Sequence, residues 1–201
     1  MDDPLARLDA AVGRLATLTA GRDRTGTTHD DGDDVVGTVG TDDAIGFDPR
    51  RLLRALDEAG AVVVVMGQVA GILHGSAELT GDLDLLWDGR AEQRAALVEA
   101  FAAVGAGLVD DDGCAVPCDE AAFALPKVQF ATAPASGDCC TPALPWGALD
   151  VTAFVDRALV ATDRDGTRIR YVAADDLIAM RRAVGRPKDL RRADELEAIL
   201  R

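Results

Sequence analysis

Apolar residues recur at helical spacing near both ends of the chain. Between residues 4 and 20, leucine and valine return every three or four positions, which predicts an amphipathic helix. Two more helices are expected over 175–184 and from Lys188 onward, because Gly185 and Pro187 interrupt the apolar pattern between them. Both terminal regions are therefore expected to be helical.

The central part of the chain alternates between short apolar runs and helical patterns. Asp48 and Pro49 are typical of a helix start, and Gly60 is typical of a helix end. The β-branched run at 61–66 predicts a strand buried on both faces. The remaining expected elements are helices over 68–73 and 91–104 and strands over 83–87, 123–130, 148–154 and 167–172. Strands that interleave with helices predict an α/β or α+β class with a mixed sheet.

Two stretches lack a clear pattern. Residues 21–46 are rich in Gly, Asp and Thr, which is typical of a flexible, solvated segment. We therefore expect an N-terminal part, residues 1–46, made of a helix and this segment, followed by a globular domain over 47–201. Within 106–147 the pattern is weak, and the stretch rich in Pro, Cys and Gly at 133–147 is expected to be a loop.

The composition narrows the classes of partner. The 201 residues are 48% hydrophobic and carry a net charge of −14, which argues against general binding to duplex DNA. No apolar run approaches the ~18 residues of a membrane span, and the acidic start lacks the pattern of a secretion signal, so a cytoplasmic protein is expected. Residues 157–201 hold eleven basic and eight acidic residues, so any contact with RNA or polyphosphate is expected there.

Several reactive side chains carry no strong functional signal. The cysteines at 114, 118, 139 and 140 could ligate zinc, but adjacent cysteines fit paired zinc knuckles poorly, so free thiols are favoured. His74 is expected to form a structural hydrogen bond, and Trp87 is expected to lie in the core. Ser76 has no His/Asp arrangement beside it that would activate a nucleophile, so a hydrolase is not expected.

The strongest chemical signal joins a glycine turn to a pair of acids. Gly67 follows a buried strand, and Asp82 and Asp84 open the next strand, where alternation places both carboxylates on one side. Such a pair is the minimal oxygen-ligand set for Mg²⁺, which completes its shell with water and substrate phosphates. A glycine at the turn lets backbone N–H groups approach a phosphate. Asp150 would complete the cluster if the strand expected around it neighbours the strand of Asp84.

Asp-x-Asp alone is also typical of two solvated acids in an acid-rich chain. The flanking residues must therefore decide between a solvated pair and a metal site. Residues 65–86 resemble the nucleotidyltransferase superfamily, in which a hydrophobic-Gly-Gly/Ser turn is followed by Asp-hydrophobic-Asp/Glu. A His-Gly pair at 74–75 precedes the Thr-Gly-Asp-Leu-Asp run at 80–84, which looks like the small bacterial branch that includes toxins of abortive-infection, type IV-like toxin–antitoxin systems. The tail over 175–189 is similar to the helix-turn-helix of that branch.

The resemblance covers residues 47–201 and implies a fold, a reaction and partners. The fold is the nucleotidyltransferase (DNA polymerase β-like) fold, a small mixed sheet flanked by helices, here with a C-terminal helical tail. The reaction is Mg²⁺-dependent transfer of NMP from an NTP to a hydroxyl of an RNA end or a protein, and a cognate antitoxin is an expected partner. Asp82, Asp84 and Asp150 would be the catalytic and metal-binding acids. The nucleotide-binding positions would be Gly67, Gln68, Arg186, Lys188 and Asp189.

Three positions depart from the pattern of that branch. Gln68 stands where the motif has Gly or Ser, Glu78 stands where the branch often has Arg, and Arg181 replaces a Lys. Gln68 is bulkier at the triphosphate, and Glu78 would repel it, so a catalytically degenerate binding or regulatory module is an alternative. An acidic protein also suits a cationic acceptor, which makes a small-molecule, antibiotic-type nucleotidyltransferase a third hypothesis.

Overall fold

The computed structural model describes residues 3–27, 38–133, 135–147 and 149–201. The strands are β1 (Val63–Val65), β2 (Leu85–Trp87), β3 (Gly107–Val109), β4 (Ala115–Val116), β5 (Lys127–Ala131), β6 (Ser136–Cys140), β7 (Leu159–Thr162) and β8 (Arg168–Tyr171). The α-helices in these ranges are α1 (Pro4–Thr19), α3 (Arg50–Glu58), α4 (Gly67–His74), α5 (Arg94–Ala103), α6 (Ala174–Val184) and α7 (Pro187–Ile199). The expected mixed α/β class is confirmed.

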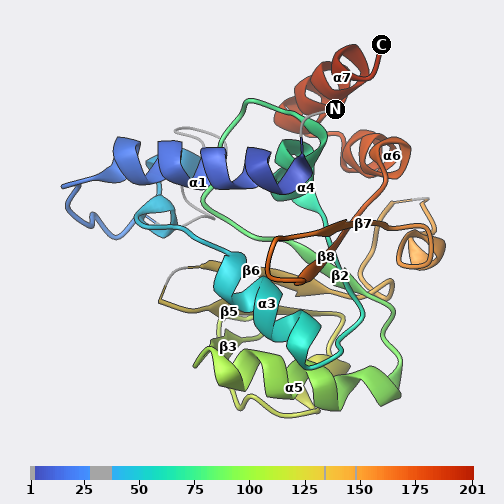
Figure 1. Cartoon of the computed structure of the whole chain (residues 1–201). Helices are drawn as coiled ribbons and strands as arrows, with labels where there is room; N and C mark the ends of the chain where they lie inside the picture. Colours follow the sequence, from blue (N-terminus) through green and yellow to red (C-terminus); the bar gives the residue numbers. More distant parts are fainter. Residues whose placement is uncertain (1–2, 28–37, 134, 148) are drawn as a thin grey trace.

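One mixed sheet holds these strands in the order β4-β3-β5-β6-β2-β1-β8-β7 (Figure 1). At its centre β1 pairs antiparallel with β2 and parallel with β8, and β2 pairs parallel with β6. Both β1 and β2 are buried along their whole length, as the β-branched run at 61–66 predicted. In Figure 1, α3 and α5 lie together in front of the strands, whereas α1, α4, α6 and α7 gather toward the top of the view. None of the helices described is both long enough and apolar enough to cross a bilayer.

Most expected helices form where their start and stop signals lie. Asp3 caps α1, because its Oδ1 accepts a hydrogen bond from the Leu5 N–H at 3.0 Å. Asp48 serves α3 in the same way, since its Oδ1 accepts from the Arg50 N–H at 3.1 Å. The expected helix over 91–104 begins with a short 3₁₀ turn (Ala91–Gln93) before α5. The helix ends predicted at Gly60, Gly75 and Gly185 are confirmed.

Two expectations in the second half of the chain are wrong. No strand covers the described part of 148–154; instead Thr152–Phe154 forms a 3₁₀ turn whose Phe154 enters the core. Conversely, β6 lies inside the stretch 133–147 that we expected to be a loop. Its Ser, Gly and Asp residues have low strand propensity, but tertiary pairing overrides propensity. A side chain at Gly137 would overlap the backbone carbonyl of Leu83, so a glycine is required for this approach. β7 was not predicted.

The N-terminal part shares the hydrophobic core with the rest of the chain. Leu8 and Leu15 of α1 are 2% and 1% exposed, and α1 packs against α4. Of the segment expected to be flexible, residues 28–37 lie outside the described residues. Around Thr41 and Ala44, which are fully buried, the chain packs closely on Gly81; a Cβ there would lie 2.6 Å from the Ala44 Cα. This part of the segment is therefore packed beside the predicted acids.

Candidate functional site

The turn from β1 into α4 is built around Gly67. Its φ is +61°, and a Cβ at this position would overlap Oδ2 of Asp84. The Met66 N–H donates to the Asp84 carbonyl at 2.9 Å, which ties the acid's backbone to the turn. Because Gly67 has no side chain, the Asp84 carboxylate lies directly against the first turn of α4.

Three carboxylates gather at this turn. The parallel pairing of Leu85 with Cys139 places Asp84 beside Asp138, one residue earlier on each segment. Burial raises the pKa of Asp84 well above its usual range, and the charges of Asp82 and Asp138 raise it further. Asp82 is itself buried and accepts a hydrogen bond from the Thr80 hydroxyl. We call Asp82, Asp84 and Asp138 the carboxylate cluster.

Asp150 does not occupy the place that we expected for it. It is exposed, and its Oδ1 accepts from the Thr152 N–H at 2.9 Å at the start of a 3₁₀ turn. The neighbour of β2 is β6, so the third acid beside Asp84 is Asp138. Sequence reasoning missed Asp138 because it lies in the stretch expected to be a loop. A signal was present: Asp138-Cys-Cys repeats the pattern of Asp84-Leu-Leu, an acid followed by two buried apolar residues.

Asp84 and Asp138 line a cavity of about 280 Å³, which we call the acidic cavity. Its other walls come from β5, from the segment after β6, from α6 and from the start of α7. Gly67 lines it at the turn. Asp82, Lys188 and Asp150 are not among the described residues that line it.

Basic groups also line the acidic cavity. Arg186 forms an ion pair with Asp189, with 2.7 Å between Nε and Oδ2, and both were predicted as nucleotide-binding residues. Lys127 was not predicted; its Nζ lies 2.9 Å from Asp111 Oδ1 and 4.0 Å from Asp138 Oδ2. The cavity therefore presents cations within a few ångströms of its acids. Burial lowers the pKa of Lys188, a partly buried neighbour of Arg186, and the Arg192 charge lowers it further.

The residues that depart from the resemblance form a network beside this cavity. Gln68 is 3% exposed; its amide nitrogen donates to Ser76 Oγ at 3.0 Å and its amide oxygen accepts from Arg181 at 2.8 Å. Gln68 is not among the described residues that line the cavity, although Arg181 is. The Gln68 amide is therefore engaged by Ser76 and Arg181 rather than exposed in the cavity lining.

Glu78 is neutralised by two arginines of α7. Its carboxylate accepts hydrogen bonds from Arg191 at 3.0 Å and from Arg192 at 2.6 Å. Burial raises the pKa of Glu78, but the hydrogen bonds from Arg192 and Arg191 outweigh burial and hold the pKa below its usual value. A carboxylate paired in this way does not present the bare repelling charge that we expected.

The donor set of the acidic cavity fits Mg²⁺ as a partial site. Among the described residues, no three Asp, Glu, His or Cys side chains are close enough to form a complete metal site by themselves. Mg²⁺ commonly takes one or two carboxylates and fills its shell with water and substrate phosphates. Burial raises the pKa of Asp84 most, and the charges of Asp82 and Asp138 add to this rise; a divalent cation would favour the ionised carboxylate.

The other reactive side chains lie outside the acidic cavity or in the core. The cysteines at 114, 118, 139 and 140 form no disulfide. Cys140 lines the acidic cavity and is buried. Trp87 is 1% exposed and lies in the core. His74 is partly buried, and its Nε2–H donates to the Val172 carbonyl at 2.8 Å. These observations confirm the expected roles of Trp87 and His74.

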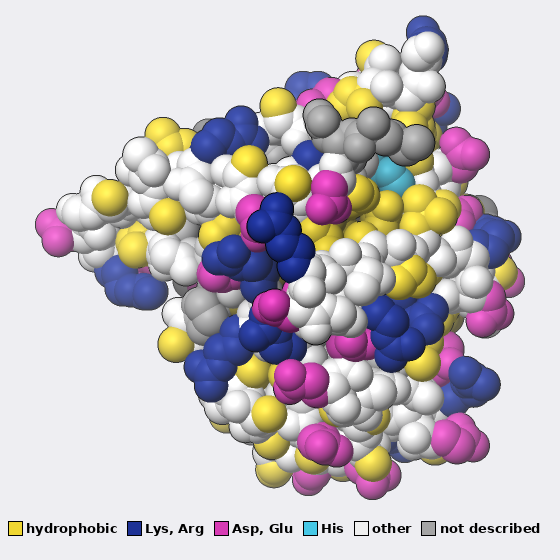
Figure 2. Space-filling view, in the orientation of Figure 1, with side chains coloured by type: hydrophobic (Ala, Val, Ile, Leu, Met, Phe, Trp, Pro, Cys, Tyr) yellow, Lys and Arg dark blue, Asp and Glu magenta, His cyan; other side chains and the backbone are white. Residues whose placement is uncertain are grey.

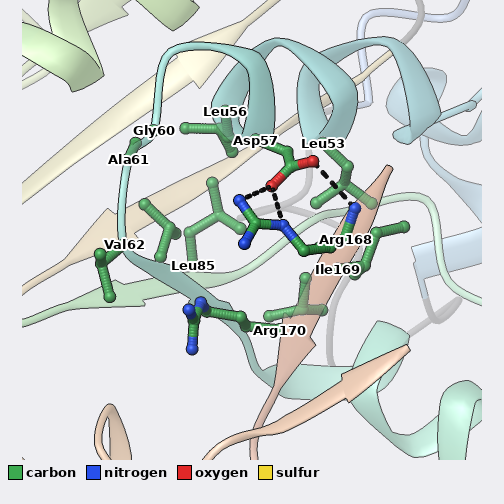
Figure 3. A pocket seen from close by; sticks show the side chains of 12 residues that line it. Leu53, Leu56, Asp57, Gly60, Ala61, Val62, Leu85, Arg168, Ile169 and Arg170 are labelled. Carbon is green, nitrogen blue, oxygen red and sulfur yellow. Dashed lines mark hydrogen bonds and ion pairs between the residues drawn. The ribbon is translucent and has the colours of Figure 1, made fainter. Parts of the chain in front are cut away.

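A second, smaller cavity of about 140 Å³ lies between α3 and strands β1 and β8 (Figure 3). We call it the α3 cavity. Figure 3 shows Leu53, Leu56 and Ile169 around it, with Asp57 facing Arg168 at its edge. Asp57 Oδ1 accepts from the Arg168 side chain at 3.0 Å, and Oδ2 accepts from the Arg168 N–H at 3.0 Å.

On the surface over α1 and α3, acidic and basic side chains are also paired, as Asp57 and Arg168 are. Figure 2 shows dark-blue basic groups on this face with acidic groups beside them. Arg50 pairs with Asp9 at 2.9 Å and with Asp48 at 2.7 Å, and Arg54 pairs with Asp165 at 3.2 Å. Crowded carboxylates therefore distinguish the acidic cavity from this surface.

No protein-family model matches the chain, and no curated protein in the comparison matches it.

Proposed function

We propose that this protein is an Mg²⁺-dependent nucleotidyltransferase, built on the nucleotidyltransferase fold, that moves NMP from an NTP to a hydroxyl acceptor. The observation that carries the proposal is the pair Asp84 and Asp138 in the lining of the cavity, with Asp84 against the Gly67 turn, beside the basic residues Arg186 and Lys127. Carboxylates for a divalent cation and cations for phosphates then lie within one cavity. The α3 cavity has one carboxylate among its described lining residues, Asp57, and Arg168 is already paired with it.

The elements around the cavity suit a bound triphosphate. The first turn of α4 presents backbone N–H groups and the positive end of the helix dipole. The space beside Gly67 is taken by the Asp84 carboxylate, so a phosphate would approach this turn next to that acid. Arg186, held by Asp189, would contact the phosphates from the start of α7. Asp84 and Asp138 would hold Mg²⁺ together with the phosphates, and Asp82 would reinforce their charge. Bound Mg²⁺ would supply Lewis-acid stabilisation of the charge on the transferred phosphoryl group.

The reaction forms one bond and breaks one bond at the α-phosphorus. The acceptor oxygen bonds to that phosphorus, and the bond to the bridging oxygen breaks, so pyrophosphate leaves. The hydroxyl proton moves to a carboxylate oxygen, for which Asp138 is the best-placed group because it lines the cavity beside Asp84. Lys127, 4.0 Å from Asp138, would hold that carboxylate in place.

The structure weakens the reasons for a degenerate module. That alternative rested on Gln68 and Glu78, yet Gln68 is occupied by Ser76 and Arg181, and Glu78 is paired with Arg191 and Arg192. Neither residue is among the described residues that line the cavity. For the acceptor, an RNA end or a protein hydroxyl remains our proposal, with a cognate antitoxin as partner of a toxin. The C-terminal arginines 182, 191, 192 and 201 each form ion pairs, so an RNA contact would need to compete with those pairs.

The test is transfer of label from each α-³²P-NTP, with Mg²⁺, to RNA, to protein and to small cationic acceptors. Label should appear on one acceptor class and vanish in Asp82→Asn and Asp84→Asn proteins that remain folded. An α-label follows the nucleotidyl group and ignores transfer of the γ-phosphate. A folded protein that labels no acceptor and binds no NTP would overturn the proposal. It would also exclude a degenerate binding module whose ligand is an NTP.

A further inference from the structure

The lining of the acidic cavity also includes apolar side chains. Two of them, Leu144 and Trp146, come from the segment after β6. Three others, Leu177, Met180 and Val184, come from α6, which also contributes the guanidinium of Arg181. The cavity thus combines carboxylates and basic groups with apolar side chains from two separate segments.

The segment after β6, which carries Leu144 and Trp146, is held in place by hydrogen bonds to backbone carbonyls. The Thr141 N–H donates to the Pro126 carbonyl at 2.8 Å, which anchors the segment to the start of β5. The Thr141 carbonyl in turn accepts from the Leu144 N–H at 3.1 Å and from the Trp146 indole N–H at 3.3 Å. The single polar atom of the Trp146 side chain is therefore already engaged. Its ring packs in part against the core, and it also lines the cavity.

One apolar side chain of the cavity lining, on α6, is exposed instead of packed in the core. Val184, at the end of α6, is 46% exposed although it lines the cavity. Its side chain does not fill the core, and a ligand in the cavity would cover it. Stacking and apolar contact are the interactions that Trp146 and Val184 can offer, because neither has a hydrogen-bonding group left for base edges.

A ligand that matches both kinds of lining side chain must carry an anionic group and a flat, apolar group. The anionic group is the triphosphate argued above, so this step rests on the proposed function. We propose that the nucleobase of the NTP binds between Trp146 and Val184, by stacking and apolar contact. Since these contacts do not read base edges, the site accepts all four bases with similar affinity.

Intrinsic fluorescence gives a direct test on the full-length protein. The chain has two tryptophans, and Trp87 is 1% exposed, so quenching by added Mg²⁺·NTP reports on Trp146. Dissociation constants would be measured by equilibrium dialysis for ATP, GTP, CTP, UTP and inorganic triphosphate, which has no base. Trp146→Ala should weaken all four NTPs about tenfold, in the range of base–aromatic stacking, and leave triphosphate unchanged. Trp146→Phe should restore most of the affinity.

A second variant guards against misfolding of the Trp146 segment. Val184→Ser, at an exposed position, should weaken the NTPs about threefold, as expected for a lost apolar contact. Val160→Ser, at a position 49% exposed on β7, is the matched control and should change nothing. Three results would overturn the base site: equal weakening of NTPs and triphosphate, loss of affinity for one base alone, or full NTP affinity in both cavity variants. Each of them leaves the proposed function standing if the wild type still transfers NMP. No binding of any NTP by the wild type would instead overturn the proposed function.

Discussion

The acidic cavity and the α3 cavity differ in how their charges are balanced. In the α3 cavity, Asp57 meets Arg168 through side-chain and backbone hydrogen bonds at 3.0 Å, so one acid faces one base. In the acidic cavity, Asp84 lies beside Asp82 and Asp138, and its pKa is raised well above the usual range. The same molecule therefore pairs charges at one site and crowds like charges at the other.

Carboxylates that lie close together lower folding stability unless a cation binds between them. Their presence here therefore points to a functional role rather than to a role in folding. A paired acid at the surface does the opposite, because it contributes a small stabilisation and needs no ligand. The predictions below contrast the two sites by making matched changes in each.

The largest expected effect is on transfer. Asp84→Asn should lower NMP transfer by about 10²–10³-fold or more, because it removes a metal-binding charge at the reacting phosphate. Asp57→Asn, the matched change in the α3 cavity, should leave the rate within about twofold, since exposed ion pairs contribute little. Initial rates with α-labelled NTP at saturating Mg²⁺ decide the matter, and equal losses in both variants would contradict the contrast.

A pair of glycines separates backbone strain from displacement of the carboxylate. Gly67 and Gly60 have φ of +61° and +72°, so alanine at either should cost about 1–2 kcal/mol of folding stability. Nothing lies within 4 Å of a Cβ at Gly60, whereas a Cβ at Gly67 overlaps Asp84. Urea unfolding should show Gly67→Ala as the less stable variant, and it alone should lose nucleotide binding. Full binding by Gly67→Ala would show that the turn does not position Asp84.

Stability in metal-free buffer should change with opposite sign at the two sites. Asp84→Asn removes a buried charge that two neighbouring carboxylates disfavour, so it should stabilise the protein by about 1 kcal/mol, or roughly 2–4 °C in Tm. Asp57→Asn breaks an ion pair and should destabilise the protein by at most about 1 kcal/mol. Thermal unfolding with a chelator present measures both, and a clear destabilisation by Asp84→Asn would argue against crowding.

The smallest expected effect is on the pH dependence of stability, and it comes from His74, a partly buried side chain that is hydrogen-bonded to the Val172 carbonyl. Burial lowers the pKa of His74, and the hydrogen bond to Val172 only partly offsets this. The unfolded chain therefore takes up the proton first, and the free energy of unfolding should fall as pH drops below about 6.5. His74→Gln keeps a donor for the Val172 carbonyl and should lose this component. Urea titrations at pH 7.5 and 5.5 test it, and identical pH dependence in both proteins would be the contrary result.

Much of the framework could be predicted from local pattern. The helix ends at Gly60, Gly75 and Gly185 and the buried run that forms β1 all follow from residue chemistry and spacing. Gly67 and Asp84 were placed together because a glycine turn and an Asp-x-Asp run carry information within a short stretch. Arg186 and Asp189 were predicted from the resemblance of the C-terminal tail, and both line the same cavity.

The rest depended on contacts between distant segments. Ser136, Gly137 and Asp138 have low strand propensity, and pairing with β5 makes them a strand, so Asp138 was hidden and Asp150 was chosen in its place. Gln68 was assigned to the nucleotide because no local signal shows that it bonds Arg181, which lies far along the chain. Pattern reasoning finds what neighbours in sequence determine, and it misses what the sheet order determines.

The most direct test asks which third acid belongs to the cation site. Mn²⁺ binding, followed by the loss of the free-ion electron paramagnetic resonance signal, would be measured with triphosphate for the wild type, Asp84→Asn, Asp138→Asn and Asp150→Asn. The structure predicts that Asp84→Asn and Asp138→Asn weaken Mn²⁺ binding by about tenfold or more, and that Asp150→Asn binds as the wild type does. Loss of binding in Asp150→Asn with full binding in Asp138→Asn would contradict the account.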